Sequence, residues 1–242
     1  MPIPAQQALI NSLGPTCILI PHPDDEALGC GGLLALLREA NQPVTAVLVS
    51  DGSASHPNSI VFSAEARRAV REGELRHALT ILGIEEEPLL LRLPDGAVPN
   101  TAGQPGFDAA AKTLHDFLHQ TQPQTLLLPW RRDPHPDHRA TYALAQAALA
   151  QLPAPPGQLE YLVWAWERAA PADLPQPADN VQEIKIDIAA QLPTKLRAVA
   201  AHRSQVAPGV FTDDPGGFLL PPAMLARFAE RPFEVYYAPN FS

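Results

Sequence analysis

The sequence predicts an α/β protein with a mostly parallel sheet and helices on both of its faces. Short apolar runs at 17–20, 44–50, 88–93 and 125–130 alternate with segments of helical periodicity. Apolar runs without polar alternation are typical of strands that are buried on both faces. Strand–helix alternation of this kind favours parallel strands joined by right-handed crossovers.

The first strand, 17–20, stops at Pro21, and a helix over 27–40 follows it. Ser63 is placed to cap a long helix that runs to residue 82, with Glu65 in its positively charged first turn. The elements expected between and after these are a strand at 44–50, a strand at 88–93, a helix at 107–120, a strand at 125–130 and an alanine-rich helix at 138–152.

A proline-rich linker at 152–157 (LPAPPG) precedes a C-terminal third with a different pattern. Here the sequence predicts strands at 161–166 and 181–188, a helix from 193 to about 204, a short helix at 223–230 and a last strand at 233–238. With 242 residues and no internal repeats, the chain is expected to form one domain over 1–242.

The composition excludes several classes of protein. The net charge of −9, from 17 Lys+Arg against 26 Asp+Glu, argues against a nucleic-acid partner, which needs a basic face. Cys17 and Cys30 are the only cysteines, too few for a disulfide scaffold. No segment has the roughly 18 apolar residues that span a bilayer, so we expect no transmembrane helix. We also expect no signal peptide, because the first basic residue is Arg38. For an untrimmed chain this predicts a cytoplasmic location.

Two polar clusters follow the strands at 17–20 and 125–130. Residues 21–26 read Pro-His-Pro-Asp-Asp-Glu, and residues 133–138 read Asp-Pro-His-Pro-Asp-His. The carboxyl ends of parallel strands form the ligand-binding edge of such a sheet. Two imidazoles and a carboxylate are the ligands of catalytic Zn2+, and Fe2+ suits the same set. The sequence therefore predicts a metal site at this edge.

The first cluster and the Ala27-Leu28-Gly29-Cys30-Gly31-Gly32 that follows it resemble the PHPDDE…G-G signature of the PIG-L (LmbE-like) N-deacetylases. The second cluster, followed by Arg139-Ala140-Thr141, resembles that family's HPDH motif. Weaker matches extend the resemblance over about residues 17–205, at Ser50-Asp51-Gly52, Arg71…Glu74-Leu75, Leu82-Gly83, Pro94-Asp95-Gly96 and Lys195…Ala201-His202-Arg203-Ser204-Gln205.

The resemblance implies a Rossmann-like fold and zinc-dependent removal of acetyl groups from N-acetylglucosamine units. Carried over by motif position, His22, Asp25 and His138 would hold one Zn2+ ion. Asp24 would be the general base that takes a proton from metal-activated water, and His135, as an imidazolium, would stabilise the oxyanion or protonate the leaving amine. The implied partner is a small amino sugar or a glycoconjugate, and the family often forms homo-oligomers.

Three further residues are candidates for substrate binding. Family positions suggest Arg71 and Asp95 as contacts to sugar hydroxyls, although Arg71 would equally suit a salt bridge on a helix surface. His56, in the segment 51–56 after the second strand, would line the sugar pocket or belong to a plain loop.

Charged residues in and before the second cluster have more than one candidate role. Asp137 would orient His135 and raise its pKa, or would cap a turn. Asp133 stands where the thiol-cofactor deacetylases of the family carry a tyrosine, so an acid step assisted by tyrosine is not expected here. The preceding Arg131 and Arg132 would meet an anionic substrate group or form a solvated surface pair.

These observations favour a zinc hydrolase that deacetylates an N-acetylated amino sugar. The competing hypotheses are an amidase for a larger N-acyl group or a thiol conjugate, and a metal- or sugar-binding domain without activity. Asp24 and His135 argue against pure binding, which needs neither residue. A phosphoesterase with two metal ions would need more carboxylate ligands.

Overall fold

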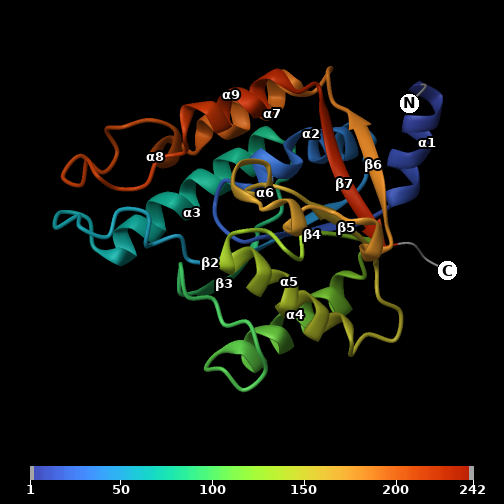
Figure 1. The fold of residues 1–242 in the computed structure, drawn as a ribbon, viewed down its shortest axis with the longest axis horizontal. Coiled ribbons are helices and arrows are strands. Elements are labelled where there is room, and N and C mark those ends of the chain that lie inside the picture. Colours follow the sequence, from blue (N-terminus) through green and yellow to red (C-terminus); the bar gives the residue numbers. More distant parts are fainter. Residues whose placement is uncertain (1–2, 240–242) are drawn as a thin grey trace.

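The computed structural model describes residues 3–239, which surround a seven-stranded sheet of order β3-β2-β1-β4-β5-β7-β6 (Figure 1). The strands are β1 (Thr16–Ile20), β2 (Val44–Ser50), β3 (Leu89–Leu93), β4 (Thr125–Pro129), β5 (Gly157–Tyr161), β6 (Val181–Asp187) and β7 (Phe233–Pro239). β1 to β5 pair in parallel, and β7 runs antiparallel between β5 and β6. The predicted α/β architecture is confirmed.

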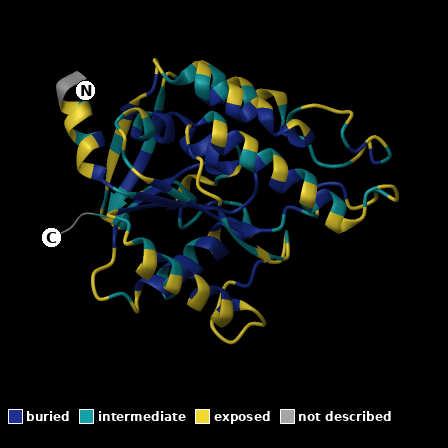
Figure 2. Cartoon of the chain, turned by 180° about the vertical axis from the view of Figure 1, so that it is seen from behind, coloured by how far each residue is buried: buried dark blue, intermediate teal, exposed yellow. Residues whose placement is uncertain are grey.

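Helices cover both faces of the sheet (Figure 1). One layer contains α2 (Asp25–Glu39), α3 (Ala64–Ile81), α7 (Leu192–Ala201) and α9 (Pro222–Glu230), and the other contains α4 (Phe107–Thr121) and α5 (Pro136–Leu149). In β1, Ile18 and Ile20 pack into the first layer, whereas Cys17 and Leu19 pack into the second. Burial on both sides explains why β1 is apolar throughout, and Figure 2 shows the strands as the buried centre.

Several element boundaries differ from the prediction. α2 and α5 begin at Asp25 and Pro136, so that the last residues of each polar cluster form the first turn of a helix. Ser63 caps α3 as predicted, since its hydroxyl accepts from the Ala66 N–H at 3.2 Å. Two features were not predicted from the sequence. One is α1 (Ile3–Leu13), and the other is the break at His202 in the helix after Pro193, before α8 (Arg203–Val206).

The strand predicted at 161–166 is wrong. β5 occupies Gly157–Tyr161, and Ala165–Arg168 form the short helix α6. Gly157 belongs to this strand and not to the linker, because its N–H already bonds to the Gln124 carbonyl beside β4. Residues 162–164 are apolar because they are buried in a loop, which periodicity alone does not distinguish from a strand.

The glycines of α2 allow other elements to approach this helix closely. A Cβ at Gly29 would lie 2.6 Å from Tyr161 Cδ2, and one at Gly31 would lie 3.0 Å from Lys195 Cγ. Lys195 Nζ donates to the Leu28 carbonyl (2.7 Å) and to Glu234 (2.6 Å). Glu234 in turn accepts from two N–H groups of the helix, at 2.8 Å each. This buried ion pair ties α2 to α7 and β7, and so fixes the helix whose first turn carries the first polar cluster.

We expect Gly29→Ala to lower the free energy of unfolding by about 1–3 kcal/mol, because the new methyl group collides with the buried Tyr161 ring. Gly73→Ala in α3 is the matched control, since a Cβ there meets no atom within 4 Å among the described residues. That control should gain about 0.5–1 kcal/mol from helix propensity. Urea unfolding measures both changes, and a Gly29→Ala variant as stable as wild type would contradict the packing argument.

Candidate active site

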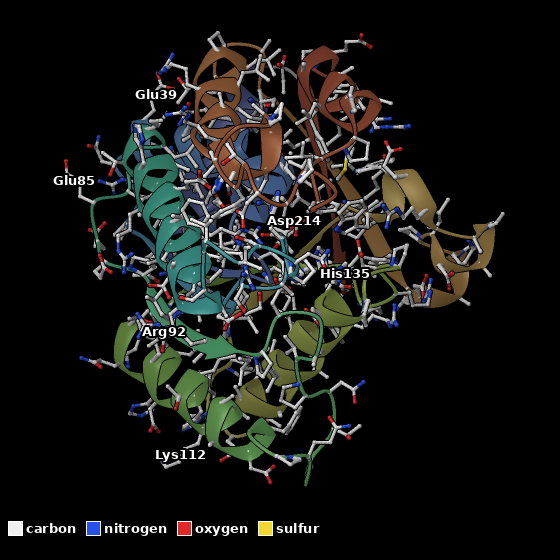
Figure 3. All side chains as sticks on the ribbon, turned by 90° about the vertical axis from the view of Figure 1, so that its left-hand side faces the viewer. Glu39, Glu85, Arg92, Lys112, His135 and Asp214 are labelled. Atoms are coloured by element: carbon white, nitrogen blue, oxygen red, sulfur yellow. The ribbon has the colours of Figure 1, made fainter. Side chains whose placement is uncertain are left out.

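The pairing of β1 with β4 brings the two polar clusters together. The connections leave these neighbouring strands in opposite directions along the sheet, which is the arrangement that opens a crevice at their carboxyl ends. Residues 22–26 follow β1 and residues 133–138 follow β4 at this edge. Figure 3 views the molecule from this side, with His135 near the middle.

The carboxylate of Asp25 lies close to both His22 and His138, whose ring centroids are 5.5 Å apart. Asp25 Oδ2 lies 3.3 Å from His22 Nδ1 and 3.1 Å from His138 Nε2. The same oxygen accepts the His22 backbone N–H at 2.9 Å, which fixes the turn before α2. Burial opposes the charged form of His138, but Asp25 and Asp133 raise its pKa above the ordinary value.

A carboxylate stands behind the outer nitrogen of each imidazole. His22 Nε2 lies 3.0 Å from Asp137 Oδ2 and 3.3 Å from Asp95 Oδ1, and His138 Nδ1 lies 3.5 Å from Asp133 Oδ1. An imidazole that donates its outer N–H to a carboxylate directs the lone pair of its other nitrogen inward. This is the usual arrangement around histidines that bind metal ions.

The three residues fit a divalent cation. Both ring nitrogens of His138 are buried and, among the residues that the structure describes, have no aligned hydrogen-bond partner. Four buried or nearly buried carboxylates (Asp25, Asp95, Asp133 and Asp137) surround the imidazoles, an excess of negative charge that a cation would balance. Among the described residues, two sets of ligand atoms lie within 4.8 Å of one another, namely His22 with His135 and His138, and His22 with Asp95 and Asp137. Asp25 Oδ2 joins His22 and His138 through the two distances of 3.3 and 3.1 Å.

Asp24 lies beside this cluster in a strained conformation. Its φ of 137° falls where residues other than glycine are rare. Its carboxylate lies 3.4 Å from Arg71 NH2, and the guanidinium of Arg71 also donates to the carbonyls of Pro23 (2.8 Å) and Gly52 (3.0 Å). Burial raises the pKa of Asp24 to about 7, against the lowering effect of Arg71.

A buried pair supports the backbone of Asp24 from behind. Glu26 accepts the Asp24 N–H at 3.1 Å, and its other carboxylate oxygen lies 2.6 Å from His202 Nε2. His202 lies at the break between α7 and α8, so the C-terminal third of the chain contributes to the support of this turn.

His135 caps the N-terminus of α5. Its Nδ1 accepts the Asp137 N–H at 3.2 Å, which leaves the ring proton on Nε2. Burial, together with His22 and His138, lowers the pKa of His135 to about 4, so the ring is neutral at pH 7. The carboxylate of Asp137 accepts instead from Gly96 N (2.7 Å) and Val98 N (3.3 Å) and contacts His22.

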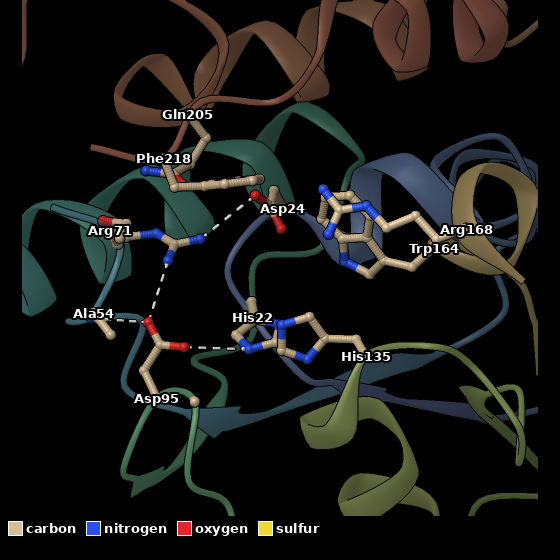
Figure 4. Close-up of a pocket in the computed structure, with 12 residues that line it drawn as sticks. His22, Asp24, Ala54, Arg71, Asp95, His135, Trp164, Arg168, Gln205 and Phe218 are labelled. Atoms are coloured by element: carbon tan, nitrogen blue, oxygen red, sulfur yellow. Dashed lines mark hydrogen bonds and ion pairs between the residues drawn. The ribbon is translucent and has the colours of Figure 1, made fainter. Parts of the chain in front are cut away.

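A cavity of about 300 Å³ opens beside these groups (Figure 4). Of the residues predicted to contact substrate, Arg71 and Asp95 line it, and Asp95 accepts the Ala54 N–H at 2.9 Å. The structure does not place His56 on this cavity, because its ring packs against Phe211 (4.7 Å) and lines a separate hollow. Arg131 and Arg132 pair with Glu160 and Asp179 and are not among the lining residues.

Trp164, Arg168, Gln205 and Phe218 also line the cavity, although the sequence did not predict them as members of the site. The motif that ends at Gln205 offered a signal, whereas the other three lie in segments without a recognisable functional motif.

Among the described residues, no helix combines the length and the apolar character needed to cross a bilayer.

The chain is similar in sequence to a family of known proteins. The family model described as "PIG-L: GlcNAc-PI de-N-acetylase" matches residues 17–149. The chain is 28% identical over 193 residues to the "Probable N-acetyl-alpha-D-glucosaminyl L-malate deacetylase 2" of Bacillus anthracis, covering 78% of this chain and 80% of the relative. It is 27% identical over 241 residues to the 1D-myo-inositol 2-acetamido-2-deoxy-alpha-D-glucopyranoside deacetylase of Gordonia bronchialis, covering 76% and 82%.

The fold is similar to that of a solved N,N'-diacetylchitobiose deacetylase from Pyrococcus horikoshii. The TM-score is 0.66 at 23% sequence identity, and the match covers 82% of this chain and 73% of that chain.

We expect Asp24→Gly to be more stable than Asp24→Ala by about 1–2 kcal/mol. Both variants lose the carboxylate, but only glycine adopts a φ of 137° without strain. The free energies of unfolding in urea, measured on both metal-loaded proteins, give the difference. Equal stability of the two variants would show that the backbone relaxes at this position without cost.

Proposed function

Because the chain belongs to the PIG-L family, we propose that it is a metal-dependent N-deacetylase that releases acetate from an N-acetylglucosamine-type amino sugar, free or within a glycoconjugate. The observation that carries this proposal is the convergence of His22, Asp25 and His138 beside Asp24 at the wall of a cavity. A site that only bound a metal ion or a sugar would not need Asp24, whose carboxylate is held next to the ligands at the cost of a strained backbone conformation.

His22 Nδ1, Asp25 Oδ2 and His138 Nε2 would hold the cation. Two imidazoles and one carboxylate suit Zn2+, and Fe2+ is the second ion that the same ligands accept. When bound, the cation supplies Lewis-acid polarisation of the acetamide carbonyl and lowers the pKa of water. Asp137 and Asp95 would orient the His22 ring, and Asp133 lies 3.5 Å from His138 Nδ1.

Asp24 acts as the general base in this proposal. It accepts a proton from the water that attacks the acetamide carbonyl, and it returns that proton to the amine as the C–N bond breaks, so that acetate and the free amine leave. A pKa of about 7 suits a group that both accepts and gives a proton near neutral pH. Arg71 is a positioning residue, because its guanidinium holds both the Asp24 carboxylate and the Pro23 carbonyl.

His135 stabilises the developing oxyanion as a neutral donor. An imidazolium was expected here from the sequence, but burial and the neighbouring histidines lower the pKa of His135 to about 4. Its proton on Nε2 serves the same purpose, since a single donor of this kind contributes about 3 kcal/mol to the transition state. Asp95 lies on the wall opposite His135, where its Oδ2 can accept from a sugar hydroxyl in addition to the Ala54 N–H.

Replacing Asp24 by Asn should lower kcat for acetate release from N-acetylglucosamine derivatives by about 10²–10⁴-fold, since the variant lacks the base. Its metal content should stay at the wild-type level, because the ligands are untouched. Asp116→Asn on the surface of α4 is the control. Acetate assays combined with elemental analysis test this, and an active Asp24→Asn enzyme would refute the assignment of the base.

Replacing His138 by Ala should remove most of the bound metal together with the activity, because the buried ring supplies one of three ligand atoms. His119→Ala, at an exposed position on α4, should keep both. Elemental analysis of the purified proteins decides the point. Unchanged metal in His138→Ala would show that the cation binds elsewhere.

A further inference from the structure

We propose that the mouth of the cavity is a subsite for an anionic group on the substrate's aglycone, and that Arg168 binds this group from its place on the Trp164 ring. This inference rests on the proposed function and narrows the substrate class to N-acetylglucosaminides that carry a carboxylate or a phosphate.

Of the two arginines that line this cavity, Arg168 is the one without a counter-charge among the described residues. Its guanidinium makes no hydrogen bond and no ion pair with any residue in the described range 3–239, and it contacts the Trp164 ring, whose centroid lies 4.2 Å from the guanidinium carbon. The neighbouring Glu167 is no partner, because it pairs with Arg227 at 2.7 Å. A guanidinium that stacks on an indole turns its flat face to the ring, so its N–H groups point outward in the guanidinium plane and remain free to donate.

The other arginine of the cavity is already occupied. Arg71 is buried, donates to two carbonyls and lies within 4 Å of Asp24 and Asp95. It has no charge left for a substrate anion. Figure 4 shows the two arginines on opposite sides of the cavity, with Asp24 between them and His135 below.

Arg168 is placed to contact the aglycone of the substrate and not its sugar ring. His22, Asp24 and Arg71 are buried at the inner wall, whereas Arg168 is exposed at the rim. With the acetamide at the inner wall, a cavity of about 300 Å³ holds roughly one sugar unit. The substituent of that sugar therefore reaches the rim. Since the protein carries a net charge of −9, its overall electrostatic field does not attract an anion. Binding of an anionic group therefore depends on the local positive charge of Arg168.

The test compares two pairs of substrates that differ in charge. One pair is N-acetyl-α-D-glucosaminyl L-malate and its dimethyl ester, and the other is N-acetyl-α-D-glucosamine 1-phosphate and methyl N-acetyl-α-D-glucosaminide. We measure kcat/KM with the metal-loaded enzyme. We also measure Kd by calorimetry on metal-loaded Asp24→Asn, which should bind each compound without cleaving it.

Arg168→Gln removes the positive charge, and Arg168→Lys keeps the charge but loses the planar pair of guanidinium N–H donors. The matched control is Arg231→Gln, because Arg231 stacks on Trp166 (4.4 Å) in the same way and lies outside this cavity. Arg168 is exposed and Arg231 is half-buried, so all three variants should fold.

We expect the wild type to favour the anionic member of at least one pair by about tenfold or more. The pair that shows the preference identifies carboxylate or phosphate. Arg168→Gln should abolish the preference, Arg168→Lys should retain part of it, and Arg231→Gln should leave it intact.

Equal kcat/KM and Kd within both pairs would overturn the subsite while leaving the deacetylase proposal standing. A preference that survives in Arg168→Gln would also overturn it. If no compound releases acetate, the deacetylase proposal fails for these sugars, and the Kd values still decide whether Arg168 selects anions.

Discussion

The parallel pairing of β1 with β4 is the constraint on which the site depends. Thr16, Cys17 and Ile18 lie opposite Thr125, Leu126 and Leu127, so the two strands end side by side. His22 and Asp137, 115 residues apart in the sequence, therefore come within 3.0 Å of each other. The connections from β1 and β4 diverge at this point, which opens a crevice at the carboxyl ends of the strands.

The helices that begin at this edge complete the arrangement. α2 starts at Asp25 and α5 at Pro136, which places the proposed ligand Asp25 and the cap residue His135 at helix N-termini. The glycines of α2 and the Lys195–Glu234 pair hold α2 against β7, so the backbone at Asp24 has little freedom to relax. The Asp24 N–H donates to Glu26 and the Arg71 guanidinium donates to the Pro23 carbonyl, so both side chains support this strained turn.

The sequence predicted the parallel sheet, the two clusters and most element types, because continuous apolar runs and cap residues are local signals. It misplaced β5, because a buried loop at 162–164 has the same apolar character as a strand. It also missed Arg168 and Trp164 as parts of the site, since only tertiary structure shows that they face the cavity. Likewise, the neutral state of His135 follows from burial next to two other imidazoles, which spacing in the sequence does not reveal.

Anomalous diffraction from crystals of the zinc-loaded protein decides whether His22, Asp25 and His138 form one metal centre. We expect a single peak enclosed by His22 Nδ1, Asp25 Oδ2 and His138 Nε2. A peak between His22 Nε2, Asp95 and Asp137, or one held by His135 in place of Asp25, would contradict it.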